Sequence, residues 1–152
     1  MEDRMKYNLA QVNIAKARAP MDDPIMQGFV EQLDSINAIA DAAPGFVWRL
    51  QTYGMDNATA LQPFENPRIL INMSVWDSIE SLRAYVYSGP HVQVLRDRAQ
   101  WFEPMTGPIL VLWWIKEGHV PTVDEAKERL ALLAEKGPTI EAFTFKISFS
   151  PP

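Results

Sequence analysis

The 152-residue sequence contains no cysteine and only two histidines. The lack of thiols excludes disulfide bonds, thiolate catalysis and cysteine-ligated zinc or iron–sulfur sites. The two histidines, His91 and His119, are not spaced one helical turn apart, so the sequence makes a weak case for a metal site. There are only seven glycines against twelve prolines, which indicates that proline marks most element boundaries.

Long apolar runs and basic clusters are also missing. The longest apolar run, residues 109–115, is far too short to cross a bilayer, and the charged start from Met1 to Lys6 lacks the apolar centre of a signal peptide. We therefore expect a cytoplasmic protein with no membrane partner. The net charge of -5, without a Lys/Arg stripe, argues against nucleic acid as a partner, because phosphate binding needs such a stripe.

The length and composition are those of one globular domain. The hydrophobic fraction of 47% and the charged fraction of 22% predict a single folded domain over residues 1–152, with its core at about 7–149. Alternating or continuous apolar patterns predict five strands, at about 7–15, 46–53, 68–76, 109–115 and 143–149. Helical spacing, capping residues and Pro/Gly breaks predict four helices, at about 24–43, 79–87, 91–102 and 123–136.

This order predicts an α+β fold of the ferredoxin-like, split βαββαβ type, with an added helix and an added C-terminal helix–strand pair. One face of the predicted sheet is unusually polar. It carries Gln11, Asn13, Asn72, Ser74 and Trp76. Because such a sheet covers one face with its own helices, we expect the polar face to meet the sheet of a second subunit around a partly wet cavity. The alternative is a solvated sheet face.

The C-terminal part of the sequence closely resembles a bacterial family, domain of unknown function 3291. The resemblance rests on Leu112-Trp113-Trp114, Gly118-His119-Val120-Pro121-Thr122, Glu125-Ala126, Arg129-Leu130, Gly137-Pro138 and Ala142-Phe143-Thr144-Phe145, and upstream on Trp76, Tyr85, His91 and Trp101-Phe102. It extends from about Leu9 to Phe149. The resemblance implies a dimeric α+β barrel, related to the antibiotic-biosynthesis-monooxygenase-like proteins, and hence a homodimer. It implies no established reaction.

A second resemblance concerns chemistry. Val75-Trp76, followed by Ser88-Gly89-Pro90-His91, is similar to the tryptophan and Ser-Pro-His segment of those monooxygenase-like proteins, although Gly89 separates Ser88 from Pro90 here. Among such relatives, some oxidise phenols or quinols without a cofactor, and others isomerise or cyclise small molecules. A heme-degrading branch uses an Asn, a Trp and a His; Asn13 fits its Asn, but the usual Trp-to-His spacing is missing.

His91 is the candidate catalytic residue, because an imidazole can remove a proton near neutral pH. Its alternative role is a backbone hydrogen bond at a helix start. Candidate ligand-binding residues are Asn13 and Asn72 as donors to an oxyanion, Arg49 as partner of an anion, Trp76 as a stacking surface, and Tyr85 and Trp101 as pocket walls. The alternatives are purely structural roles: a hydrogen bond between Asn13 and Asn72, an exposed Arg49 on an edge strand, and tryptophans buried in the core. We expect His119 to order the loop before the last helix.

Three functions follow from these residues. The leading hypothesis is a cofactor-independent enzyme that oxygenates, isomerises or cyclises a planar phenol- or enol-like small molecule, with His91 as base. The second is heme binding with His91 as axial ligand. The third is a module that binds a metabolite without catalysis.

Overall fold

The computed structural model describes residues 6–50, 68–87 and 96–152, which form an α+β arrangement around one antiparallel sheet. Its strands are β1 (Tyr7–Ala17), β2 (Phe46–Arg49), β3 (Ile69–Trp76), β4 (Phe102–Glu103) and β5 (Leu110–Lys116). Its helices are the 3-10 turn η1 (Pro24–Met26), α1 (Gln27–Ala42), α2 (Ile79–Val86) and α4 (Val123–Lys136), and residues 96–101 are also helical. The predicted α+β, ferredoxin-like class is confirmed.

The helices begin where side chains can satisfy free backbone N–H groups. Asp23 accepts a hydrogen bond from Ile25 N at 3.0 Å, Ser78 from Ser81 N at 3.1 Å, and Thr122 from Glu125 N at 3.1 Å. All three starts agree with the sequence prediction. The predicted end of the last helix is also confirmed, at Gly137, whose φ of 72° suits glycine.

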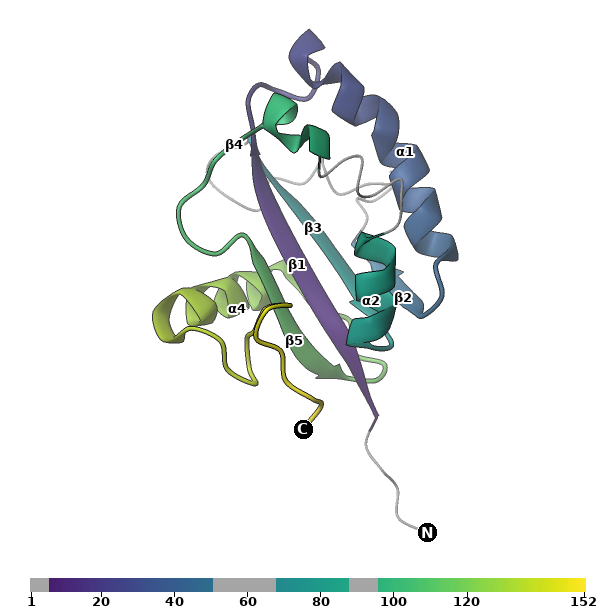
Figure 1. The fold of residues 1–152 in the computed structure, drawn as a ribbon, viewed down its shortest axis with the longest axis vertical. Coiled ribbons are helices and arrows are strands. Elements are labelled where there is room, and N and C mark those ends of the chain that lie inside the picture. Colours follow the sequence, from purple (N-terminus) through teal and green to yellow (C-terminus); the bar gives the residue numbers. More distant parts are fainter. Residues whose placement is uncertain (1–5, 51–67, 88–95) are drawn as a thin grey trace.

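The long strand β1 lies at the centre of the sheet (Figure 1). One edge pairs with β3, where Asn13 lies opposite Asn72. The other edge pairs with β5 along most of its length, and with the short β4 at Lys16 and Ala17. The strand β2 extends the sheet beyond β3. β4 was not predicted, since two residues are too few to show an alternation.

The two faces of the sheet are covered by different helices of the same chain. On the apolar face, the side chains of Val12, Met73 and Val111 form a core with Leu130 and Leu133 of α4. On the polar face lie α1 and α2, which Figure 1 shows on the far side of β1 and β3 from α4. The prediction that a second subunit's sheet covers the polar face is therefore wrong, because this chain's own helices cover it.

The predicted strand over residues 143–149 is also wrong. Phe143 makes only an isolated bridge with Leu112, and the backbone then turns, with Thr144 N donating to Ile147 O at 3.3 Å. Phe143 and Phe149 nevertheless pack in a cluster with Leu9 and Trp76. We call residues 143–149 the C-terminal strap. Its alternating aromatic side chains pack against side chains of the sheet, whereas, in the portion of the chain that the structure describes, its backbone does not pair with a neighbouring strand beyond the bridge at Phe143.

Within the described ranges 6–50, 68–87 and 96–152, no helix combines the length and apolar character needed to cross a bilayer.

Candidate functional site

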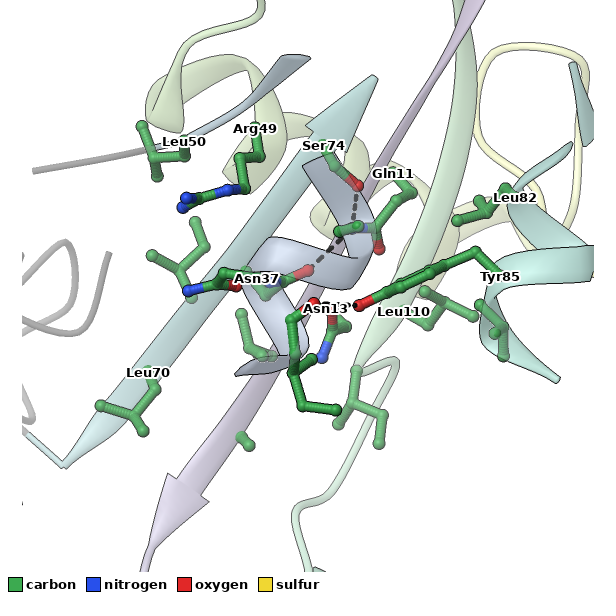
Figure 2. A pocket seen from close by; sticks show the side chains of 18 of the residues that line it. Gln11, Asn13, Asn37, Arg49, Leu50, Leu70, Ser74, Leu82, Tyr85 and Leu110 are labelled. Atoms are coloured by element: carbon green, nitrogen blue, oxygen red, sulfur yellow. Dashed lines mark hydrogen bonds between the residues drawn. The ribbon is translucent and has the colours of Figure 1, made fainter. Parts of the chain in front are cut away.

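A cavity of about 460 Å³ separates the polar face of the sheet from α1 and α2. Strands β1 and β3 supply its polar floor, and α1 supplies much of its apolar roof (Figure 2). The residues that line the cavity include Gln11, Asn13, Phe29, Asn37, Arg49, Asn72, Ser74, Trp76, Leu82, Tyr85, Arg98, Phe102, Leu110 and Phe145. This mixture of apolar walls and a few convergent polar groups is typical of small-molecule sites.

A hydrogen-bonded row crosses the floor of the cavity. The Gln11 amide nitrogen donates to Asn72 Oδ1 at 2.9 Å and to Ser74 Oγ at 2.7 Å (Figure 2). The Trp76 indole Nε1 donates to the same Ser74 oxygen at 2.8 Å. Because Gln11 and Ser74 are buried, these bonds replace those that water would make. The row therefore fixes the orientation of the Asn72 amide.

Asn13 differs from its neighbours in this row. It lies directly opposite Asn72 in the strand register and lines the cavity. Among the residues that the structure describes, no hydrogen bond joins the Asn13 side chain to another group. The alternative that Asn13 and Asn72 satisfy each other is therefore not what the structure shows. Asn72 is exposed although its strand has a neighbour on each side, because the cavity lies above it.

Arg49 is buried, with its side chain only 8% exposed. Its Nε donates to Asp41 Oδ1 at 2.7 Å and its Nη2 to Asp41 Oδ2 at 3.2 Å, which is the two-pronged arginine–carboxylate geometry. The alternative of an exposed edge-strand charge is thus excluded. The guanidinium lines the cavity as predicted, but Asp41 at the end of α1 already compensates part of its charge.

Tyr85 and Trp76 form the aromatic end of the cavity. Their rings stack with centroids 5.1 Å apart, and Phe46 meets the Trp76 ring edge-on at 5.4 Å. Trp76 has no exposed surface, so Tyr85, rather than Trp76 as predicted, offers a ring to a ligand. Figure 2 shows the Tyr85 hydroxyl directed toward the middle of the cavity, from the side opposite Arg49.

The Tyr85 hydroxyl keeps its proton at neutral pH and can therefore donate a hydrogen bond. Burial raises the pKa of the Tyr85 phenol to about 12, although the nearby Arg49 charge acts in the opposite direction. The neutral phenol donates a hydrogen bond to the backbone oxygen of Ile36 at 3.4 Å, a long bond that a better acceptor could replace.

The remaining predicted residues lie elsewhere. His91 falls outside the described residues, so its predicted role as base stays a prediction. Trp101 packs against Phe29 in a separate hydrophobic cluster, with ring centroids 5.7 Å apart. It is not among the residues that line the cavity, whereas its neighbour Phe29 is. His119 contacts Glu125 on the first turn of α4 at 2.8 Å, as expected for a residue that orders this loop.

Two polar cavity residues, Asn37 and Arg98, were not predicted, although the sequence held a signal for each. Asn37 lies one helical turn after Leu33, which belongs to the apolar stripe of α1. Arg98 lies one turn before Phe102, on the apolar side of its own predicted helix. A polar residue on an otherwise apolar stripe was the available sign of a cavity. No group of three or more His, Asp or Glu side chains suited to hold a metal occurs in the described part of the chain.

The fold and this internal cavity define the chain as a ferredoxin-like α+β domain with a small-molecule-sized site. Residues 8–152 match the family model described as Domain of unknown function (DUF3291), so the protein belongs to this family, as its C-terminal motifs predict. A comparison with curated proteins found no match.

The solved structures that this chain resembles are distant in sequence. A conserved protein from Methanosarcina mazei is 15% identical, with a TM-score of 0.53 over 70% of this chain and 90% of the other. PA3566 from Pseudomonas aeruginosa is 11% identical, with a TM-score of 0.50 over 77% and 100%. SnoaB, a cofactor-independent oxygenase from Streptomyces nogalater, is 14% identical, with a TM-score of 0.44 over 74% and 95%. At such identities the likeness concerns the fold alone.

Proposed function

We propose that this protein is a small-molecule enzyme that needs no bound cofactor and acts on a planar phenol- or enol-like substrate in the cavity. One observation carries the proposal. The amide of Asn13, which has no hydrogen-bond partner in the part of the chain that the structure describes, lies beside the oriented amide of Asn72 on the floor of a cavity with apolar walls. Polar groups at the floor of an apolar cavity favour the binding of a ligand that is flat, largely apolar and carries an oxygen atom able to accept hydrogen bonds.

The chemistry begins with loss of a proton from the substrate. His91 is the proposed base, as the sequence predicts. The oxygen of the resulting phenolate or enolate accepts hydrogen bonds from the amide nitrogens of Asn13 and Asn72, and the neutral phenol of Tyr85 is a third donor. The positive charge of Arg49 favours the anion from the cavity wall, to a degree reduced by Asp41.

An electron-rich anion of this kind allows isomerisation, ring closure or direct reaction with dioxygen. In the oxygenase version the substrate is its own reductant. A ring CH2 group and one O2 molecule become a carbonyl group and water, so no further electron donor is needed. The Tyr85 ring offers the substrate a stacking surface. The apolar side chains of Leu82 and Leu110 in the cavity wall exclude water from the substrate.

Turnover with a defined panel tests the proposal. Naphthols, hydroquinones and cyclic 1,3-diketones would be incubated with the enzyme in air and followed by oxygen uptake and by product absorbance. We expect at least one class to turn over, with kcat falling about 100-fold in Asn13→Leu and in His91→Ala. Asn8→Leu is the matched control, because Asn8 is an amide on the same strand that does not line the cavity.

Each other outcome has a defined meaning. Binding without turnover of any class would instead support a non-catalytic metabolite-binding module. Heme binding through His91 stays a prediction that no described contact favours; a Soret band on hemin titration that His91→Ala abolishes would support it. Full activity of both Asn13→Leu and His91→Ala would contradict the proposed site.

A further inference from the structure

Arg98 is a second arginine in the cavity wall, and its situation differs from that of Arg49. It belongs to the helical residues 96–101 and lines the cavity together with Phe29 and Phe102. The side chain is exposed, and no ion pair or hydrogen bond joins it to another residue in the described ranges. By contrast, Arg49 has Asp41 at 2.7 Å.

The nearest acidic residues in the sequence are engaged elsewhere. Asp97 accepts a hydrogen bond from Gln100 at 3.5 Å, and Glu103 pairs with Lys16 at 3.4 Å. The protein as a whole carries a net charge of -5. Arg98 is thus a cation without an acidic partner within residues 6–50, 68–87 and 96–152, and it lies at the wall of an apolar cavity. Such a position is one where a ligand can supply negative charge.

The helix that carries Arg98 is held firmly against the rest of the fold. Arg18 donates from its side chain to Ala99 O at 2.9 Å, and its backbone N–H donates to Trp101 O at 2.8 Å. Trp101 itself is buried, and a Cβ atom added to Gly28 would approach its ring to 3.3 Å. The tie to β1 and the close fit to α1 fix the position of Arg98 relative to the cavity.

The strand register shows that the cavity extends along β1 and β3. Gln11 and Asn13 lie toward the Trp76 and Tyr85 end, whereas Ala15 and Leu70 lie toward β4 and Arg98. From Gln11 to Ala15 the strand rises about 13 Å at roughly 3.3 Å per residue. The cavity is thus long enough to hold a ring system along the floor with an acidic group at one end.

We propose that the ligand is a planar organic acid, whose carboxylate binds Arg98 while its ring system lies over Asn13 and Asn72 toward Tyr85. This inference rests on the proposed function and adds the substrate class to it. An arginine is suited to this task, since its planar guanidinium binds a carboxylate through two parallel hydrogen bonds.

A pair of nearly isosteric probes tests the inference by calorimetric titration. 2-Naphthoate carries the negative charge, and 2-naphthamide has the same shape without it. We expect wild type to bind naphthoate at least tenfold more tightly. Arg98→Gln should lose that advantage while binding naphthamide as before, and Arg98→Lys should retain part of it. Because Arg98 is exposed, added salt should also reduce the advantage.

Arg96→Gln is the matched control, because Arg96 lies on the same helical segment and does not line the cavity. It should change neither affinity. Equal affinity of wild type for both probes, or an equal loss of both in Arg98→Gln, would overturn the inference and leave the proposed function standing. If wild type bound neither probe, the proposed small-molecule cavity would fail and the inference with it.

Discussion

Two buried donors, Gln11 Nε2 and Trp76 Nε1, depend on the single hydroxyl of Ser74. Gln11 also orients Asn72, so this hydroxyl is linked both to the stability of the sheet and to the geometry of the cavity floor. At the scale of one residue, an unpaired polar group buried in the face of a sheet lowers the stability of the fold, because water cannot replace the lost hydrogen-bond partner there.

Ser74→Ala should therefore lower the free energy of unfolding by about 1–3 kcal/mol, the cost of a buried donor left without an acceptor. Urea unfolding followed by circular dichroism would measure the change. Ser148→Ala is the control, since Ser148 is exposed in the C-terminal strap, and it should have almost no effect. A Ser74→Ala variant as stable as wild type would show that the pair rearranges around the missing oxygen.

Glu125 gives the protein a defined response to acid. Burial alone raises the pKa of its carboxyl. Hydrogen bonds from His119 and Trp113, both 2.8 Å long, act together with the charge of His119 and a hydrogen bond at Thr122 to lower the pKa below its ordinary value of 4.5. The folded state thus favours the ionised form. Its stabilising contribution is present above about pH 4.5 and is lost as the pH falls through the lowered pKa.

Glu125→Gln should accordingly destabilise the protein at pH 7, and the difference from wild type should shrink as the pH falls below the ordinary glutamate pKa. Urea unfolding of both proteins at pH 7 and at about pH 3.5 measures this difference. Glu128→Gln on the exposed side of α4 serves as the control. A difference that is the same at both pH values would contradict this account of the carboxylate.

At the scale of elements, the connection from α1 to β2 is a tightly fitted turn. Gly45 has a φ of 82°, and a Cβ atom there would collide with the side chains of Ser81 and Asp77. Gly45 O also accepts a hydrogen bond from Asp77 N at 2.8 Å, which ties β2 to the start of α2. The turn that follows α1 therefore contacts the start of α2 closely.

Gly45→Ala should be more destabilising than Gly107→Ala. Gly107 has a similar φ of 78° but no atom within 4 Å of the added Cβ, so only the backbone strain, about 1 kcal/mol, should appear there. Gly45→Ala adds a steric clash to the same strain. Thermal unfolding of the two variants under the same conditions separates the effect of the steric clash from the effect of the backbone strain. Equal destabilisation would mean that Ser81 and Asp77 move away without cost.

The strands and helices could be predicted because local rules fix them. Alternation along β1 and β3 and the caps at Ser78 and Thr122 were sufficient. The C-terminal strap could not be predicted in this way. Phe143 and Phe145 alternate like strand residues, but whether a neighbouring strand offers free hydrogen-bonding groups is a property of the assembled sheet.

The same limit applies to the candidate site. Parity along the strands correctly placed Asn13, Asn72 and Arg49 at one cavity. Parity could not show which helices cover which face of the sheet. The apolar face is covered by α4, which lies far from β1 and β3 in the sequence, and this leaves the polar face to α1 and α2. The stacking of Tyr85 over Trp76 and the pairing of Arg49 with Asp41 depend on where α2 and α1 dock, and side-chain spacing carries no information on docking.

At the scale of the molecule, the cavity is formed by one chain, so its use does not require the predicted homodimer. We expect calorimetry to give one 2-naphthoate per chain, with an affinity that stays constant when the protein is diluted. Sedimentation equilibrium over the same concentration range would report the oligomeric state. An affinity that fell together with dissociation of a dimer would show that a partner subunit helps to form the site.

The central position of β1 has a consequence for how the chain is made. Its partner β3 is synthesised more than fifty residues after it, and β5 almost a hundred residues after it. At translation rates of about 5–20 residues per second, the strand waits roughly 5–20 s for its last neighbour. The edge that pairs with β5 is open during that whole time, and the edge that pairs with β3 is open until β3 has been made, which favours pairing with other chains. The strand that is best protected in the finished protein is therefore the one most in need of a holding chaperone on the ribosome.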